Sequence, residues 1–300
     1  MEAYRGTILL LIAELCLTLS SVFGKSATNL SPVSGTELAF FRYLIGFVTV
    51  SGYMYYKNAS FRPNNTRLVL LRGVTNTVAV LLFYTGFQYG TVTNANMLNL
   101  TYPVFVFFFS PFINGEKSRM KNLLWIGAAL AGVYLVVVPD FQGINTGDVF
   151  ALASGFVAGF GICYLREARK YDDSDIILFY LMVPGMVITF LIMLPSFIMP
   201  EGMALVYAIL SGAVAVTGQM FLTVGYRYIE AATGAIVSGS RILFAGIIGV
   251  TFFADPLTCR ILAGAVLILA ALIGVSGFLE RRRRGPAGGI RNPIPYDPGV

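Results

Sequence analysis

The 300-residue sequence contains no histidine, three cysteines, one tryptophan and few charged residues, which make up 12% of the chain. Without histidine it lacks the commonest metal ligand and the side chain that titrates near neutral pH. Cys16, Cys163 and Cys259 follow no metal-ligand spacing, so we interpret them as free thiols. The P-loop pattern GxxxxGK[ST] is also absent. We therefore expect no metal, no cofactor and no catalytic residues, and a protein that is not an enzyme.

The residues that are present make the chain very apolar, with 56% hydrophobic residues. Soluble domains carry about 25% charged residues, roughly twice the share found here. The lipid bilayer is the solvent that suits such a chain. The formal net charge of +6 does not indicate nucleic-acid binding, because the basic residues stand in short segments between apolar runs.

Long apolar runs predict the architecture, since one membrane span needs about 20 mainly apolar residues. The first run contains Glu14 and lacks a convincing cleavage site, so we interpret it as a span and not as a signal peptide. The prediction is an all-α integral membrane protein of ten transmembrane helices, near 6–24, 36–56, 69–89, 94–113, 121–138, 147–165, 175–195, 203–225, 232–253 and 260–279.

Loop charges predict the orientation. With the N-terminus inside, the outer loops hold only Lys25 and Arg260, and the other loop lysines and arginines fall on the cytoplasmic side. We therefore expect both termini in the cytoplasm and a multi-pass protein of the cell (inner) membrane. The segment 281–300 begins with four arginines and is rich in proline and glycine, which predicts a disordered basic cytoplasmic tail.

The two halves of the chain resemble each other at an offset of 139 residues. LFYTGFQYG at 82–90 matches FLTVGYRYI at 221–229, and Glu116 falls on Asp255. We predict a first five-helix repeat over 1–140 and a second over 141–280. An odd number of helices makes the second copy enter the membrane from the opposite face, so the repeats are expected to be inverted. That arrangement is typical of alternating-access carriers.

A family resemblance is seen in three segments of the chain, 31–46 (SPVSGTELAFFRYLIG), 93–138 and 238–269. In the second segment Pro103 lies within the predicted fourth span, and Gly115-Glu116 follow at its end. Together the three segments resemble the EamA family of the drug/metabolite transporter superfamily. The resemblance implies a ten-helix carrier of amino acids, drugs or related metabolites. Asp255 replaces the family's usual glutamate and Arg241 stands opposite Tyr102 of the first repeat, so the subfamily and its substrate stay open.

Charges inside spans are the first candidate site residues, because each costs several kcal/mol unless it is paired or hydrated. Glu14 and Arg241 lie eight and nine residues into their predicted spans, at about 12–14 Å depth from the same face for a rise of about 1.5 Å per residue. They are expected to hold an ammonium group or proton and a carboxylate, respectively. The alternative is a pair that only locks two helices together.

Other polar residues extend the candidate set. Asn99 and Tyr102 are three residues apart on one predicted helix face, and their repeat counterparts are Ser238 and Arg241. These two pairs are expected to line a central cavity, although interhelical hydrogen bonding is an alternative role. The predicted substrate-binding set also includes Tyr84 and Arg42, and for Arg42 the alternatives are snorkelling to the headgroups and pairing with Glu37.

The predicted function is therefore a secondary transporter, an exporter of small zwitterionic or amphiphilic metabolites such as amino acids, working by alternating access as a monomer or homodimer. The alternative within this class is an uptake carrier for a vitamin or nucleotide-like metabolite. From another class, the alternatives are an intramembrane enzyme or a non-transport membrane scaffold.

Overall fold

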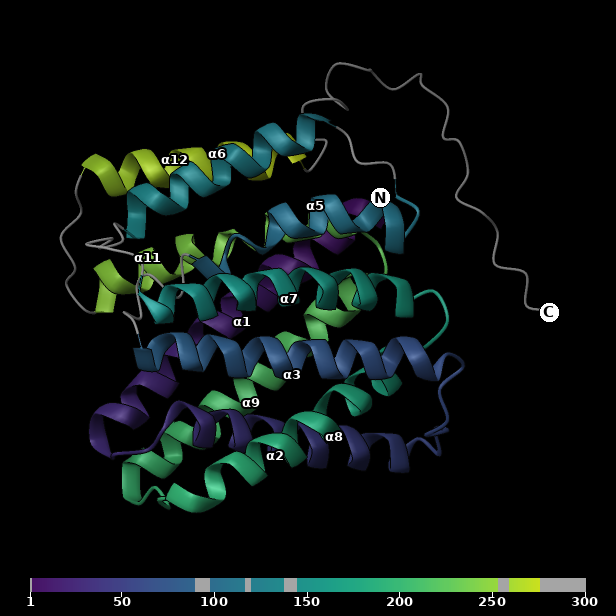
Figure 1. Cartoon of the computed structure of the whole chain (residues 1–300), viewed down its shortest axis with the longest axis vertical. Coiled ribbons are helices and arrows are strands. Elements are labelled where there is room, and N and C mark those ends of the chain that lie inside the picture. The colour runs from purple at the N-terminus through teal and green to yellow at the C-terminus, as the bar shows by residue number, and fades with distance from the viewer. Residues whose placement is uncertain (1, 90–97, 117–119, 138–144, 253–258, 276–300) are drawn as a thin grey trace.

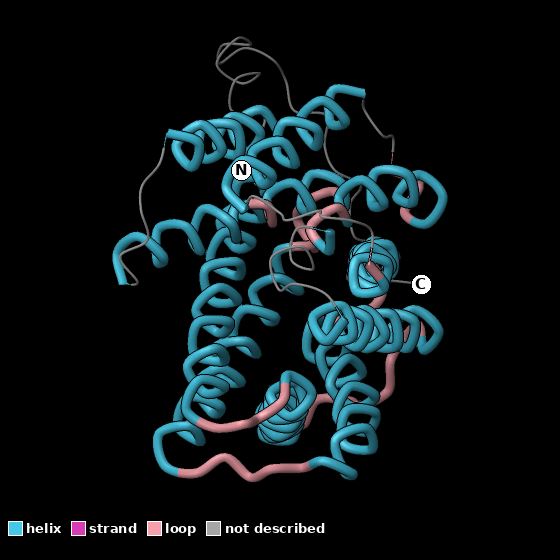
Figure 2. The backbone as a smooth tube through the Cα atoms, turned by 60° about the vertical axis from the view of Figure 1, so that its left-hand side comes forward, coloured by secondary structure: helices cyan, strands magenta, loops and turns pink. Residues whose placement is uncertain are grey.

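The computed structural model describes residues 2–89, 98–116, 120–137, 145–252 and 259–275 (Figure 1). Within these ranges all regular structure is helical and no strand occurs. The long helices cross the molecule and the loops join them at its ends (Figure 2). The elements are α1 (Glu2–Leu30), α2 (Gly35–Tyr56), α3 (Thr66–Tyr89), α5 (Tyr102–Ile113), α6 (Met120–Val137), α7 (Thr146–Ala168), α8 (Ser174–Met193), η1 (Leu194–Ser196), α9 (Gly202–Gly225), α10 (Ala231–Val237), α11 (Ser240–Phe252) and α12 (Cys259–Val275).

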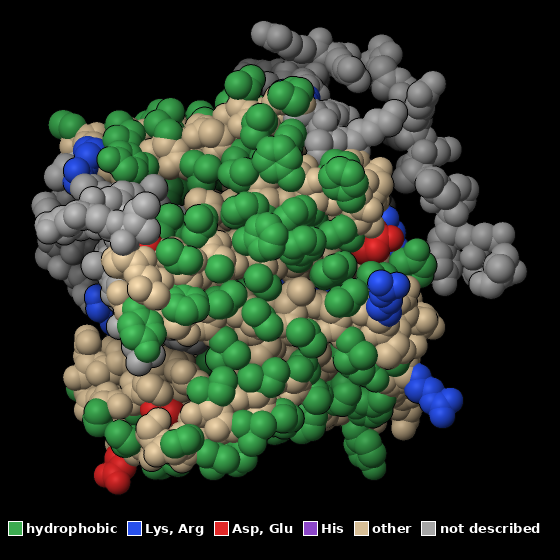
Figure 3. All heavy atoms as spheres, viewed as in Figure 1, with side chains coloured by type: hydrophobic (Ala, Val, Ile, Leu, Met, Phe, Trp, Pro, Cys, Tyr) green, Lys and Arg blue, Asp and Glu red, His purple; other side chains and the backbone are tan. Residues whose placement is uncertain are grey.

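The helices have the length and composition of membrane spans. Among the described residues, seven helical stretches are long and apolar enough to cross a bilayer, and three shorter apolar helices accompany them at Tyr102–Ile113, Met120–Leu135 and Leu262–Gly274. Charged side chains on the visible face gather toward the two ends of the helices, and hydrophobic side chains cover the middle (Figure 3). The chain is therefore a multi-pass membrane protein.

Two predicted spans differ from the observed helices. The first continues past Gly24 and Lys25 to Leu30 and ends before Ser31-Pro32, because a residue that precedes proline disfavours the helical conformation. The ninth, predicted as one helix over 232–253, is divided into α10 and α11 by a turn at Ser238-Gly239. Part of the predicted fourth span and the whole of the predicted tail 281–300 lie outside the described residues.

The helix boundaries recur at the interval seen in the sequence. Gly35 of α2 and Ser174 of α8 begin their helices 139 residues apart. The packing follows this interval: α1 lies along α9, and their counterparts α7 and α3 lie along each other. The pairs α6–α12 and α2–α8 form opposite edges of the bundle (Figure 1).

Counterpart helices run in opposite directions. On α2, Tyr43 lies against Gly185 of α8, whereas Gly46, further along α2, lies against the earlier residue Met182. The two helices therefore cross antiparallel. The α1–α9 contact is antiparallel too, because Ser20 of α1 bonds to Ser211 of α9, whereas the later residue Gly218 of α9 lies against the earlier residue Ala13 of α1. The largest buried apolar cluster draws residues from both halves of the chain, among them Leu10, Val69, Ile162 and Leu222.

We expect Gly73→Ala in α3 to destabilise the bundle. A Cβ at Gly73 would lie 2.2 Å from the backbone oxygen of Tyr180 in α8, so the two helices would have to separate. Such overpacking costs about 1–3 kcal/mol. The melting temperature of the purified protein in detergent measures the effect. Gly127→Ala is the matched control, because nothing lies within 4 Å of a Cβ there. Equal melting temperatures for the two variants would contradict the α3–α8 contact.

Candidate functional site

An ion pair joins α1 to the first residues of α11. The Arg241 guanidinium donates from Nε to Glu14 Oε2 at 2.8 Å, and Arg241 Nη2 lies 2.8 Å from the same oxygen. The Glu14 side chain is fully buried, whereas the Arg241 side chain is 36% exposed, so the pair is accessible from the arginine side. The structure thus brings together the two charges that the sequence places at similar depth.

The pair lies beside an interruption in the ninth span. At the turn between α10 and α11, the Gly239 and Arg241 N–H groups donate to the carbonyls of Ile236 (3.0 Å) and Ser238 (3.2 Å), each three residues back. A similar turn at Leu100-Thr101 precedes α5, whose first turn contains Pro103. Proline has no N–H to continue the α-helical ladder. Interrupted spans in corresponding halves are a common way for carriers to build a binding site within the membrane.

Tyrosine and serine side chains surround the carboxylate. Tyr102 of α5 and Tyr226, which caps α9, are both buried, and both lie within electrostatic reach of Glu14. Ser238 lies next to both tyrosines, and the Tyr102 hydroxyl donates to the Ala235 carbonyl at 3.5 Å. Oε1 of Glu14 is buried without a hydrogen-bond partner. A buried acceptor of this kind is able to receive a donor from a ligand.

The structure does not bring Asn99 to this group. Its amide Nδ2 donates to Ser154 Oγ of α7 at 2.7 Å, and Ser154 in turn donates to the Ala79 carbonyl of α3. Asn99 and Tyr102 do not share one continuous helix face, because the turn at Leu100-Thr101 separates them. The hydrogen bonds of Asn99 are those of a residue that joins helices. The side chain of Tyr84 in α3 lies outside the described part of the structure.

Arg42 of α2 points toward α9 and not toward Glu37. Its Nη2 donates to Gln219 Oε1 at 3.1 Å. Glu37 instead accepts from the backbone N–H groups of Ser34 and Ile198, at 2.5 Å each, and so ties the start of α2 to the loop before α9. The suggested Glu37–Arg42 pair is therefore wrong: the carboxylate is used as a helix cap.

Two buried polar residues near Arg42 and Glu14 were not singled out by the sequence pattern. Arg72 lies in α3 with 4% of its surface exposed, and Tyr226 is completely buried. Arg72 lies within electrostatic reach of Arg42, Tyr43 and Tyr226. The sequence does contain an indication for Arg72. It is a charged residue within the predicted span 69–89, which makes it a candidate site residue on the same ground as Glu14.

A second charged network fastens one end of the bundle. Glu116, just after α5, accepts through Oε1 from Arg166 Nε and through Oε2 from the Ala231 N–H at the start of α10, each at 2.9 Å. Arg166 Nη1 also donates to the carbonyls of Tyr226 and Arg227. Burial raises the pKa of Glu116, while Arg166 opposes that rise. We call this network the Glu116–Arg166 latch; it joins α5, α7, α9 and α10.

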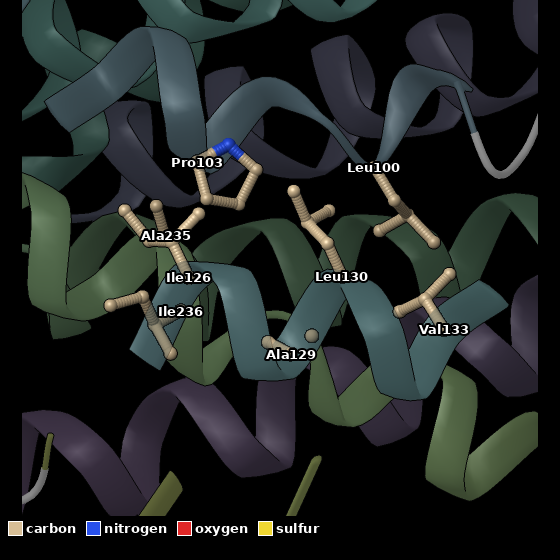
Figure 4. A pocket seen from close by; sticks show the side chains of 9 residues that line it. Leu100, Pro103, Ile126, Ala129, Leu130, Val133, Ala235 and Ile236 are labelled. Atoms are coloured by element: carbon tan, nitrogen blue, oxygen red, sulfur yellow. The ribbon is translucent and has the colours of Figure 1, made fainter. Parts of the chain in front are cut away.

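A cavity lies between α6 and the two helix interruptions at Leu100-Thr101 and Ser238-Gly239, and it is too small and too apolar to hold a metabolite. Its volume is about 10 Å³, close to the minimum for one water molecule. Pro103 and Leu100 face Leu130 and Val133 of α6 across it (Figure 4). In the described ranges no three His, Cys, Asp or Glu side chains gather as metal ligands would. The polar group around Glu14 and Arg241 is therefore the candidate site.

The amino-acid sequence of the chain is similar to those of several membrane transporters. Solute carrier family 35 member G1 of Mus musculus is 26% identical over 278 residues, which cover 87% of this chain and 75% of that protein. The pseudopaline exporter CntI of Pseudomonas aeruginosa (strain UCBPP-PA14) is 24% identical over 264 residues, covering 86% and 91%. An uncharacterized transporter of Archaeoglobus fulgidus is 28% identical over 256 residues, covering 84% and 91%.

The fold also matches a solved structure. A protein whose crystal structure is described without a function superposes with a TM-score of 0.78 at 15% sequence identity, covering 93% of this chain and 98% of the other. The model of the EamA-like transporter family matches twice along the chain, at residues 4–138 and 145–277. These two matches account for nearly all of the helices, and the chain belongs to the EamA-like transporter family.

Proposed function

We propose that this membrane transporter is an exporter of small zwitterionic metabolites, amino acids above all, working by alternating access. In this proposal ten spans form two inverted repeats, 1–140 and 141–280, with both termini in the cytoplasm of a cell whose inner membrane holds the protein. The antiparallel packing of α2 on α8 supports the inversion. The similarity to the pseudopaline exporter CntI supports the direction.

The Glu14–Arg241 pair carries the proposal. A zwitterion presents an ammonium group and a carboxylate, which match the acid and the base of the pair. The substrate's ammonium would take the place of Arg241 beside Glu14, and its carboxylate would bind the released guanidinium. Exchange of one ion pair for two keeps every charge neutralised, so binding does not leave a bare charge in a low-dielectric interior.

In this proposal the Glu116–Arg166 latch is the cytoplasmic gate of the alternating-access cycle. It closes the end of the bundle that we assign to the cytoplasm, where it holds α10 against α7. Because α10 leads directly to the turn at Ser238-Gly239, a movement of α10 is transmitted to Arg241. Opening of the latch would let a substrate enter the site from the cytoplasm. Closing it would block return to the cytoplasm, so that the substrate leaves on the outer side.

We expect Glu14→Gln and Arg241→Ala each to lower amino-acid efflux at least about tenfold, because loss of a charged partner costs about 1.5–3 kcal/mol. Efflux from cells that overexpress each variant, corrected for the amount of folded protein, measures the effect. Glu201→Gln, an exposed residue before α9, is the matched control and should transport normally.

Each single change leaves one buried charge unpaired, so the double variant Glu14→Gln with Arg241→Gln is included. It should recover stability without recovering efflux. Normal efflux by folded single variants would show that the pair is not the substrate site.

A second prediction concerns the latch. Cys163 of α7 is buried and lies within electrostatic reach of Glu116. In a background with Cys16→Ser and Cys259→Ser, we expect Glu116→Gln to raise the rate at which N-ethylmaleimide labels Cys163 about tenfold, since the lost charge-assisted bond stabilises the closed form by about 1.5 kcal/mol or more. Glu167→Gln on the same helix end is the control. An unchanged labelling rate would exclude the latch as a gate.

A further inference from the structure

Two arginines of the membrane interior have no acidic partner. Arg72 is 4% exposed, Arg42 is partly buried, and the two lie within electrostatic reach of each other. Neither forms an ion pair with any carboxylate in the part of the chain that the structure describes. Neighbouring buried cations repel each other and are costly in a low-dielectric region. An arrangement of this kind is stable only if the two charges are neutralised or hydrated.

Three unpartnered nitrogen atoms of these two arginines and of the neighbouring Gln219 are donors. Nε of Arg42, Nε of Arg72 and Nε2 of Gln219 are buried without a hydrogen-bond partner. Gln219 itself is 3% exposed, and its Oε1 is already occupied by Arg42. Three free donors and two positive charges suit an acceptor that carries negative charge, such as a carboxylate.

This donor group is close to the Glu14–Arg241 site but chemically different from it. Tyr226 lies within electrostatic reach of both Arg72 and Glu14, so the polar interior continues from one to the other. At Glu14 the unpartnered atom is a carboxylate oxygen, which accepts hydrogen bonds. One end of the polar interior therefore suits an ammonium group and the other suits an anion.

We propose that Arg42, Arg72 and Gln219 form a subsite for a second acidic group of the transported molecule. The preferred substrates would then be acidic amino acids or similar zwitterions with an additional carboxylate. This inference rests on the proposed function, which supplies the ammonium site at Glu14. It adds a charge preference that the Glu14–Arg241 pair alone does not produce.

The packing of Arg72 shows how the chain makes room for it. Its Nη1 lies 3.0 Å from the position that a Cβ on Gly161 of α7 would occupy, so the guanidinium rests against bare backbone. Replacing Arg72 by methionine keeps most of the side-chain length and removes the unpaired charge. A purely structural arginine would make this variant less stable, whereas an arginine held for a ligand would not.

The test measures the melting temperature of the purified full-length protein in an uncharged detergent, with succinate against sodium chloride at equal ionic strength. A ligand at about ten times its dissociation constant should raise the melting temperature by about 3 °C. We expect succinate to protect the wild type and Arg67→Met, in which an exposed arginine of the same helix is replaced. In Arg72→Met the protection should be lost, while the melting temperature without succinate does not fall.

A second experiment tests whether the subsite binds an acidic group of the transported molecule or any free anion. Its probes are L-glutamate and L-glutamine, which differ in one charge. The wild type should be protected more by glutamate than by glutamine, and Arg72→Met should be protected equally by the two amino acids. Glu14→Gln should lose protection by glutamine and keep protection by succinate. Unchanged succinate protection in Arg72→Met would overturn the subsite, and equal protection of the wild type by both amino acids would overturn its assignment to the substrate. If glutamine protects Glu14→Gln normally, the proposed function fails separately.

Discussion

A charge in the hydrocarbon region is tolerated only when it is neutralised or hydrated, and the structure is arranged around one place where this condition is met. Glu14 of α1 is fully buried and depends on Arg241 for its neutralisation. That contact places the start of α11 beside α1, directly after the turn at Ser238-Gly239 that divides the ninth span. The interruption of the helix and the ion pair therefore lie next to each other in the structure.

Much of the fold follows from the sequence, because the length of an apolar run is a strong signal. The start of α2 at Gly35 and of α8 at Ser174 each fall within one residue of prediction. The interruption after Val237 is not predicted, since the run from 232 to 253 is mainly apolar and a glycine within such a run does not by itself specify a break. The partition of the bundle into alternating partners, α1 with α9 and α3 with α7, needs tertiary packing that no local pattern encodes.

The candidate site was predictable in its charges and not in its hydrogen bonds. Glu14 and Arg241 stand out because a lone charge in an apolar run is unusual, and equal depth suggests that they meet. Asn99 was placed on the wrong face because a turn at Leu100-Thr101 rotates the helix that follows. Arg72 is not among the predicted site residues, and its position six residues after the start of α3 does not tell whether its side chain is buried or snorkels to the surface. Only the packing of α3 shows that this one is buried.

The distance along the chain between Glu14 and Arg241 has a consequence for biosynthesis. The two residues are 227 positions apart, so Glu14 enters the membrane long before the arginine that neutralises it has been translated. During that interval α1 and α3 also lack α9 and α7, the helices against which they pack. A chain that stops early would leave a carboxyl side chain and two helix faces unsatisfied in the lipid. Such a fragment therefore differs from the finished protein in leaving Glu14 without the residue that neutralises it.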